Sequence, residues 1–107
     1  AKGLPWTTSK SFAGSAIVTP TVAKERFAAR DSIHFTLAIN GVLRQDGRTS
    51  AMLFPIPVVL THLLRGHALR AGDLIFTGTP AGVGPVEAGQ IGELRWGEFL
   101  NYKVRWI

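Results

Sequence analysis

The stretch that decides the fold of this chain is residues 72–85, Gly72-Asp73-Leu74-Ile75-Phe76-Thr77-Gly78-Thr79-Pro80-Ala81-Gly82-Val83-Gly84-Pro85. It begins as a short apolar segment with the composition of a strand and continues as a loop rich in Gly, Thr and Pro. Glycine lets a backbone approach a ligand closely, and threonine hydroxyls and free amides bind oxyanions. We therefore expect a strand over residues 73–77, followed by either an anion-binding loop or a plain structural turn.

The clearest strand signal lies upstream of this stretch, over residues 33–39. Apolar residues alternate there with mostly polar ones, which is the period of a half-buried strand: Ile33, Phe35, Leu37 and Ile39. Asn40-Gly41 then gives the strongest short signal for a hairpin turn, and residues 42–45 are expected to return as the partner strand. We expect a further turn at Asp46-Gly47.

One helix is predicted over residues 57–65. Pro57 suits the first helical turn, and Arg65 favours the negative end of the helix dipole. Gly66 is a natural stop, and the apolar side is made by Val58, Leu60, Leu63 and Leu64.

A second hairpin is predicted from residues 91–96 and 99–107, around Gly97-Glu98. Residues 1–31 look irregular, since they show no sustained period. The chain therefore reads as a single domain over residues 1–107. Its predicted class is α+β, dominated by β structure and containing one helix.

Composition and charge narrow the classes of function. The chain has 107 residues, no cysteine, and 12 Lys and Arg against 7 Asp and Glu, a net charge of +5. The basic residues are scattered, which favours anions in general, so no nucleic-acid partner is expected. A small basic nucleic-acid-binding β domain remains the weaker alternative. The longest apolar run, residues 52–60, is too short for a bilayer, so no membrane partner is expected. The lack of cysteine fits a reducing compartment, and a cytoplasmic location is predicted.

The sequence offers no local metal or nucleotide motif. His34, His62 and His67 are the three histidines, and neither they nor the dispersed carboxylates have the spacing of metal ligands. We therefore expect no metal ligand within the chain. Residues 78–84 also lack the Gly-Lys-Ser/Thr of a P-loop and the spacing of a dinucleotide fold.

Taken together, three motifs make the chain similar to the fumarylacetoacetate hydrolase family, in its acylpyruvate hydrolase and oxaloacetate decarboxylase branch. The first is Lys2-Gly3-Leu4-Pro5-Trp6-Thr7, followed by Lys10-Ser11-Phe12. The second is Asn40-Gly41-Val42-Leu43-Arg44-Gln45-Asp46-Gly47, with Thr49-Ser50 and Met52-Leu53-Phe54. The third is the stretch over residues 72–85 itself.

The resemblance implies a mixed, β-dominated fold whose strands roll around a central active site, usually in a homodimer. Members of the family bind Mg²⁺ or Mn²⁺ through three acidic ligands and chelate a 2-oxo acid or 1,3-dicarbonyl compound on the metal. The metal acts as a Lewis acid, so that cleavage of a carbon–carbon bond leaves a stabilised enolate. Hydrolysis of acylpyruvates, decarboxylation of oxaloacetate and isomerisation all remain open for this chain.

The resemblance also assigns roles to residues. Lys10 matches a lysine that steadies substrate and enolate charge, although a lone lysine is more often simply solvated. Gly78 and Thr79 match the loop that holds carboxylate or carbonyl oxygens, and Phe12 is expected to support the placement of Lys10. Four further residues match a segment that is mainly structural or near the dimer contact, and no catalytic role is predicted for them: Arg44, Gln45, Thr49 and Ser50.

In hydrolytic members of the family a His–Glu pair activates the attacking water. This pair and the family's metal-binding carboxylates match positions upstream of residue 1. The chain is therefore expected to be the C-terminal portion of a longer catalytic domain. As partners we expect a small anionic 2-oxo acid, and either a second copy of the chain or a companion chain that carries the upstream segment. The alternative is a non-catalytic fragment or remnant of the family that lacks the metal site.

Overall fold

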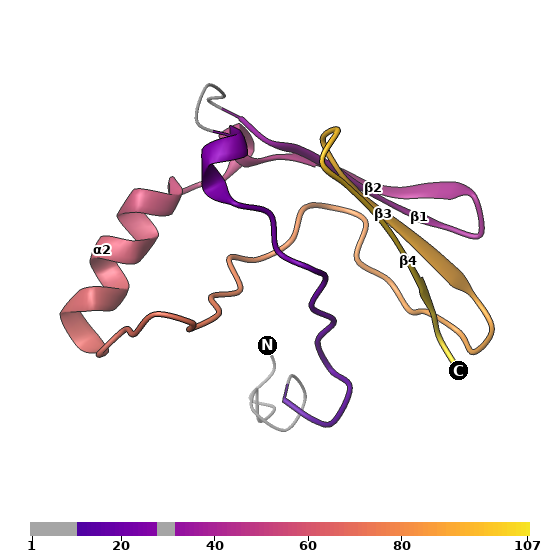
Figure 1. The fold of residues 1–107 in the computed structure, drawn as a ribbon. Coiled ribbons are helices and arrows are strands. Elements are labelled where there is room, and N and C mark those ends of the chain that lie inside the picture. The colour runs from indigo at the N-terminus through magenta and orange to yellow at the C-terminus, as the bar shows by residue number, and fades with distance from the viewer. Residues whose placement is uncertain (1–10, 28–31) are drawn as a thin grey trace.

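A computed structural model describes residues 11–27 and 32–107 of the chain. Within these ranges one four-stranded sheet lies beside one α-helix (Figure 1). The elements, in chain order, are η1 (Lys24–Phe27), β1 (His34–Ile39), β2 (Val42–Arg48), η2 (Thr49–Ala51), α2 (Ile56–Gly66), β3 (Ile91–Trp96) and β4 (Leu100–Arg105). The β-dominated α+β fold with one α-helix, predicted from the sequence, is confirmed.

The sheet is antiparallel throughout and has the strand order β2-β1-β3-β4. The predicted turn at Asn40-Gly41 connects β1 to β2, and both residues have positive φ, 48° and 81°. Such a two-residue turn follows the right-handed twist of the strands it joins. Asn40 also ties the hairpin to β3, because its side-chain oxygen accepts a hydrogen bond of 2.8 Å from the Ile91 amide.

The β2 strand is longer than the sequence indicated, and the predicted turn at Asp46-Gly47 is wrong. Both residues continue the ladder with β1, where Gly47 pairs with Phe35. A Cβ atom at Gly47 would lie 2.7 Å from the Phe35 ring, so this glycine makes room for an aromatic side chain instead of reversing the chain. Gly47 is accordingly one of the buried residues of the sheet.

A β-bulge interrupts the pairing of β1 with β2. Leu37 pairs with Gln45 and Ala38 pairs with Leu43, so Arg44 is an extra residue without a partner on β1. A bulge breaks the strict alternation of side chains along a strand and redirects the residues next to it. The bulge therefore decides which way Arg44 and Gln45 reach.

The second predicted hairpin is confirmed in β3 and β4. Gly92 of β3 faces the ring of Trp106, because a Cβ atom there would lie 2.7 Å from it. The core of the sheet is nevertheless thin. Among the described residues Ile39, with 4% of its surface exposed, is the one buried large hydrophobic residue.

The predicted helix is confirmed, and it begins one residue earlier than predicted, at Ile56. No residue of α2 is buried, although several are large and apolar, among them Leu64 with 61% of its surface exposed. Figure 1 shows the helix standing off from the sheet. Within the described ranges, no helix combines the length and apolar character needed to span a bilayer.

The strand predicted over residues 73–77 is not observed. This segment has no ladder with any strand of the described chain. A strand exists only where another backbone offers matching donors and acceptors, and the apolar residues alone do not supply that partner. Leu74 and Phe76 are instead left exposed, at 61% and 68%.

Candidate functional site

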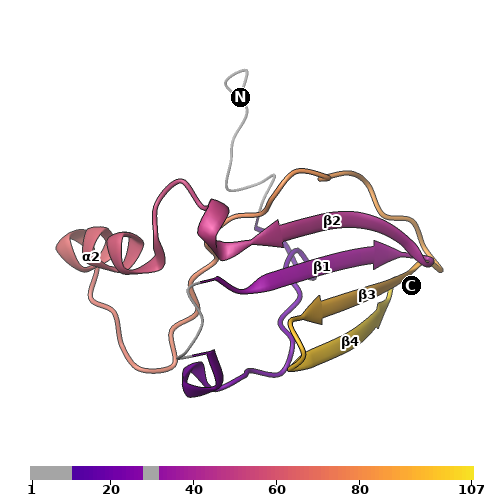
Figure 2. The ribbon, with the colours of Figure 1, turned by 90° about the horizontal axis from the view of Figure 1, so that it is seen from above.

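The loop that follows this segment, residues 77–85, is called here the glycine loop. Figure 2 shows the chain after Phe76 running along the outer side of β2, the edge strand of the sheet. Side chains of β2 hold the loop in place, and no backbone ladder joins the two. Two motifs that are far apart in the sequence therefore form one structural unit.

Gln45 holds the first half of the glycine loop. Its side-chain nitrogen donates a hydrogen bond of 2.8 Å to the Thr79 hydroxyl and a second of 3.1 Å to the Pro80 carbonyl. Pro80 also lies against Gly47, where a Cβ atom would come within 3.0 Å of the proline ring. The β2 strand thus provides both the polar contacts and the small residue that this turn requires.

Arg44 holds the second half of the loop. Its guanidinium donates a hydrogen bond of 3.3 Å to the Pro85 carbonyl. Gly82 has a φ of 102°, and a Cβ atom there would collide with the Arg44 carbonyl oxygen. Glycine is therefore required at position 82 for two reasons, the positive φ of its backbone and the close approach of β2.

The predicted substrate-binding residues lie at the exposed part of this loop. Gly78 has a φ of 101° and open space around it, and Thr79 is exposed next to it. Neither amide donates to another backbone group among residues 11–27 and 32–107. The loop therefore presents two amide donors and one hydroxyl on a braced backbone, which is the chemistry of an oxyanion-binding turn.

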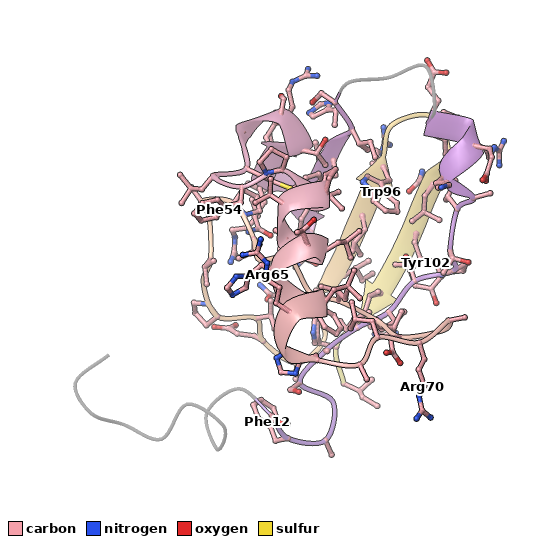
Figure 3. The ribbon with its side chains drawn as sticks, turned by 90° about the vertical axis from the view of Figure 1, so that its left-hand side faces the viewer. Phe12, Phe54, Arg65, Arg70, Trp96 and Tyr102 are labelled. Atoms are coloured by element: carbon pink, nitrogen blue, oxygen red, sulfur yellow. The ribbon has the colours of Figure 1, made fainter. Side chains whose placement is uncertain are left out.

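Two other predicted site residues have, in the part of the chain that the structure describes, no observed contact with the loop that would test their roles. Lys10 lies outside the described residues. Phe12 has 62% of its surface exposed, and Figure 3 shows it beyond the end of the sheet, away from Trp96 and Tyr102 on β3 and β4. The roles given to Lys10 and Phe12 by the family resemblance stay predictions.

A second polar cluster lies on the sheet, and the sequence did not indicate it. His34 and Asp46 are joined by a contact of 2.6 Å between Nε2 and Oδ1, and Arg95 of β3 pairs with Glu93 at 2.6 Å. His34 and Arg95 line a shallow pocket of about 280 Å³ with Phe35, Thr36 and Gly97. The register of the β1–β2 hairpin could have predicted that His34 lies near Asp46. A regular hairpin without the bulge at Arg44, however, gives a register that differs by one residue and places Asp46 opposite Phe35.

The described residues do not fit a metal site. Nowhere in residues 11–27 and 32–107 do three His, Cys, Asp or Glu side chains gather closely enough to hold an ion. His34 with Asp46 supplies two potential ligands, and an exposed pair of this kind lacks the third ligand that protein metal sites use.

The chain is similar to proteins of one known family. A family model described as fumarylacetoacetate (FAA) hydrolase C-terminal matches residues 1–104. A mouse protein named oxaloacetate tautomerase FAHD1, mitochondrial, is 46% identical over 86 residues, covering 80% of this chain and 39% of that protein. The oxaloacetate decarboxylase, mitochondrial, of Dictyostelium discoideum is 35% identical over 91 residues, covering 85% of this chain and 42% of its own length.

The fold has a solved counterpart as well. The crystal structure of a fumarylacetoacetate hydrolase family protein from Yersinia pestis CO92 matches with a TM-score of 0.91 and 34% identity, covering 99% of this chain and 48% of that one. The chain thus spans about two fifths of the length of the curated relatives quoted above. Both relatives carry the word mitochondrial in their names, and the cytoplasmic location of this chain stays a prediction.

Proposed function

Because the chain belongs to the fumarylacetoacetate hydrolase family, we propose that it supplies the anion-binding part of an enzyme active on 2-oxo acids. The proposed reactions pass through an enolate. They are the cleavage of acylpyruvates and related 1,3-dicarbonyl acids and, on the same site, the decarboxylation or tautomerisation of oxaloacetate. The names of the mouse and Dictyostelium relatives support this branch of the family.

The single observation that carries the proposal is the braced glycine loop. A 2-oxo acid presents a carboxylate and a neighbouring carbonyl, and its enolate places further negative charge on oxygen. The Gly78 and Thr79 amides and the Thr79 hydroxyl are exposed donors on a backbone held by β2. Donors fixed in advance bind and orient such an anion without having to reorganise.

Lys10 is proposed to neutralise the negative charge of the enolate, with Phe12 supporting its placement. An ammonium group is well suited to this task, because it is a compact point charge with three donors. The assignment depends on the family motif Lys10-Ser11-Phe12.

The divalent cation of the family is proposed to be held by carboxylates that match positions upstream of residue 1. Mg²⁺ or Mn²⁺ bound there would supply Lewis acidity to the substrate carbonyl. The described residues contribute no ligand set for the ion. Their proposed task is limited to binding and orienting the anion.

The chain is further proposed to work with a second copy of itself or with a companion chain that carries the upstream segment. It exposes 8837 Å², whereas a folded monomer of this mass exposes about 5,800 Å². Its radius of gyration is 15.5 Å, against about 13 Å for a compact domain of this length. Large apolar residues such as Leu53 and Leu64 contribute to this surface, at 93% and 61% exposed.

The proposal is tested on the native assembly that contains this chain. The masses of all its polypeptides are measured first, native and denatured, and the assembly is then offered oxaloacetate and an acylpyruvate with Mg²⁺. Loss of the enol absorbance of oxaloacetate, release of pyruvate from it, or cleavage of the acylpyruvate supports the proposal and identifies the reaction. An assembly that carries the upstream carboxylates, binds Mg²⁺ and leaves both substrates unchanged would overturn it.

A further inference from the structure

The Pro80 carbonyl determines which end of the Gln45 side-chain amide faces the glycine loop. The Pro80 carbonyl can only accept, so the end of the Gln45 amide that faces the loop must be its nitrogen. That nitrogen carries two protons. One goes to the Pro80 carbonyl at 3.1 Å and the other to the Thr79 hydroxyl oxygen at 2.8 Å, so both donors are used.

This arrangement fixes the role of the Thr79 hydroxyl. A hydroxyl can donate or accept, but here its oxygen accepts from Gln45, so its own proton must point elsewhere. Among residues 11–27 and 32–107, no group accepts that proton. We infer that Gln45 is a positioning residue, which holds the Thr79 hydroxyl so that its proton is directed to an oxygen of the bound 2-oxo acid. The inference rests on the function proposed above.

The bulge in β2 is the structural device that makes this contact. In a regular strand Arg44 and Gln45 would point to opposite faces of the sheet. The extra residue at Arg44 removes this alternation, and both side chains reach the same loop, at Pro85 and at Thr79. Arg44 hydrogen-bonds the far end of the loop at Pro85, whereas Gln45 donates to the Thr79 hydroxyl itself.

Gln45 is also sheltered enough to keep this orientation. Its side chain is half-buried between β2 and the loop, whereas Thr79 is exposed to the ligand side. Of the two hydrogen bonds that its amide donates, the one to the Pro80 carbonyl is part-buried and the one to the Thr79 hydroxyl is exposed. The Pro80 bond therefore fixes the orientation of the amide, and the Thr79 hydroxyl stays on the open side of the loop.

The test is a double-mutant cycle in the native assembly, with oxaloacetate as the substrate. Gln45→Met removes both donors at similar volume and adds no charge. The expected result is a rise in KM of about 5- to 20-fold with kcat nearly unchanged, because an anion loses an oriented donor. In a Thr79→Val background the same Gln45→Met change is expected to alter KM less than about twofold, because the group on which Gln45 acts is gone.

A second variant and a matched control separate positioning from general stability. Gln45→Glu presents only acceptors to the loop, so it turns the hydroxyl proton toward itself and is expected to raise KM more than Gln45→Met. Gln90→Met applies the same change to a glutamine whose side chain bonds the Glu87 amide, and KM is expected to stay at the wild-type value. A purely structural role would instead lower kcat and the melting temperature together.

The outcomes separate the positioning role of Gln45 from the proposed function. A wild-type assembly that binds Mg²⁺ but is inert toward oxaloacetate and acylpyruvate overturns the proposed function, and this inference with it. A reactive wild type in which Thr79→Val raises KM while Gln45→Met leaves it unchanged overturns the positioning role alone. So does a Gln45→Met effect of the same size with and without the Thr79 hydroxyl.

Discussion

Gln45 on β2 and Thr79 in the glycine loop stand 34 residues apart in the sequence, and a hydrogen bond of 2.8 Å joins their side chains. The bond connects the second and third motifs of the family resemblance, which sequence reasoning treated separately. A segment without a predicted catalytic role thereby becomes the support of the predicted anion-binding loop.

The hydroxyl of Thr79 is expected to contribute directly to substrate affinity. Thr79→Val keeps the branched shape but removes the donor, and KM for oxaloacetate should rise about 10- to 100-fold, the range for a hydrogen bond to a charged group. Thr79→Ser keeps the hydroxyl and should stay within a few-fold of wild type. Steady-state kinetics on the native assembly measures both, and equal KM values for the two variants would contradict the role.

Lys10 is expected to act on turnover instead. Lys10→Met removes the ammonium that would neutralise the enolate, and kcat should fall at least about 100-fold, the effect typical of losing an oxyanion-stabilising group. Lys103→Met serves as the control, because Lys103 is an exposed lysine on β4. A Lys10→Met assembly that turns over oxaloacetate at nearly the wild-type rate would remove Lys10 from the mechanism.

Two of the three glycines of the loop, Gly78 and Gly82, should differ in how well they tolerate alanine. Gly78→Ala meets only the cost of a positive φ, about 1–2 kcal/mol, since nothing lies within 4 Å of the new Cβ. Gly82→Ala bears that cost and also collides with the Arg44 carbonyl, so the loop must leave β2. Cleavage by a protease within residues 77–85 should rise in Gly82→Ala far more than in Gly78→Ala. Equal cleavage rates in both variants would show that the loop is not seated on β2.

Gly47 is expected to be required for packing and not for chain reversal. Gly47→Ala places a Cβ 2.7 Å from the Phe35 ring and should lower the free energy of unfolding by about 1–3 kcal/mol, the range for overpacking. A smaller residue at Phe35 relieves the clash, so Phe35→Leu should cost less in the Gly47→Ala background than alone. Denaturant unfolding of the four variants measures this coupling, and strictly additive effects would speak against the contact.

The apolar side of α2 is expected to lie in an interface of the assembly. Leu64→Lys places a charge on that side and should shift the assembly toward smaller species in native mass spectrometry. His62→Lys is the matched control, because two residues correspond to about 200° of rotation around a helix. An unchanged mass distribution in Leu64→Lys would show that this side of the helix remains outside the interface.

Much of the fold could be predicted because its signals are local. Asn40-Gly41 accommodates the positive φ values of a tight hairpin turn, and the period of two in residues 33–39 needs only that segment. The helix over Ile56–Gly66 is set by an early proline and a terminal glycine. The family motifs predicted an anion-binding loop in the same way, from the residue types in one short stretch.

The failed predictions share a different cause. Leu74 to Phe76 has the composition of a strand but finds no backbone partner in the described chain, and Gly47 looked like a turn residue although it makes room for Phe35. In each case the outcome depends on a residue that is distant in the sequence. The composition of a segment indicates which backbone conformations it can adopt, but it does not indicate which distant residues the segment will contact.

The sequence by itself determined the hairpins, the helix and the family, because dihedral preference and periodicity act over a few residues. Only the tertiary structure decided that the chain bulges at Arg44, that Gln45 consequently reaches Thr79, and that the glycine loop is held by side chains along an edge strand. A bulge changes register by one residue, and that single step decides which side chains meet across the sheet.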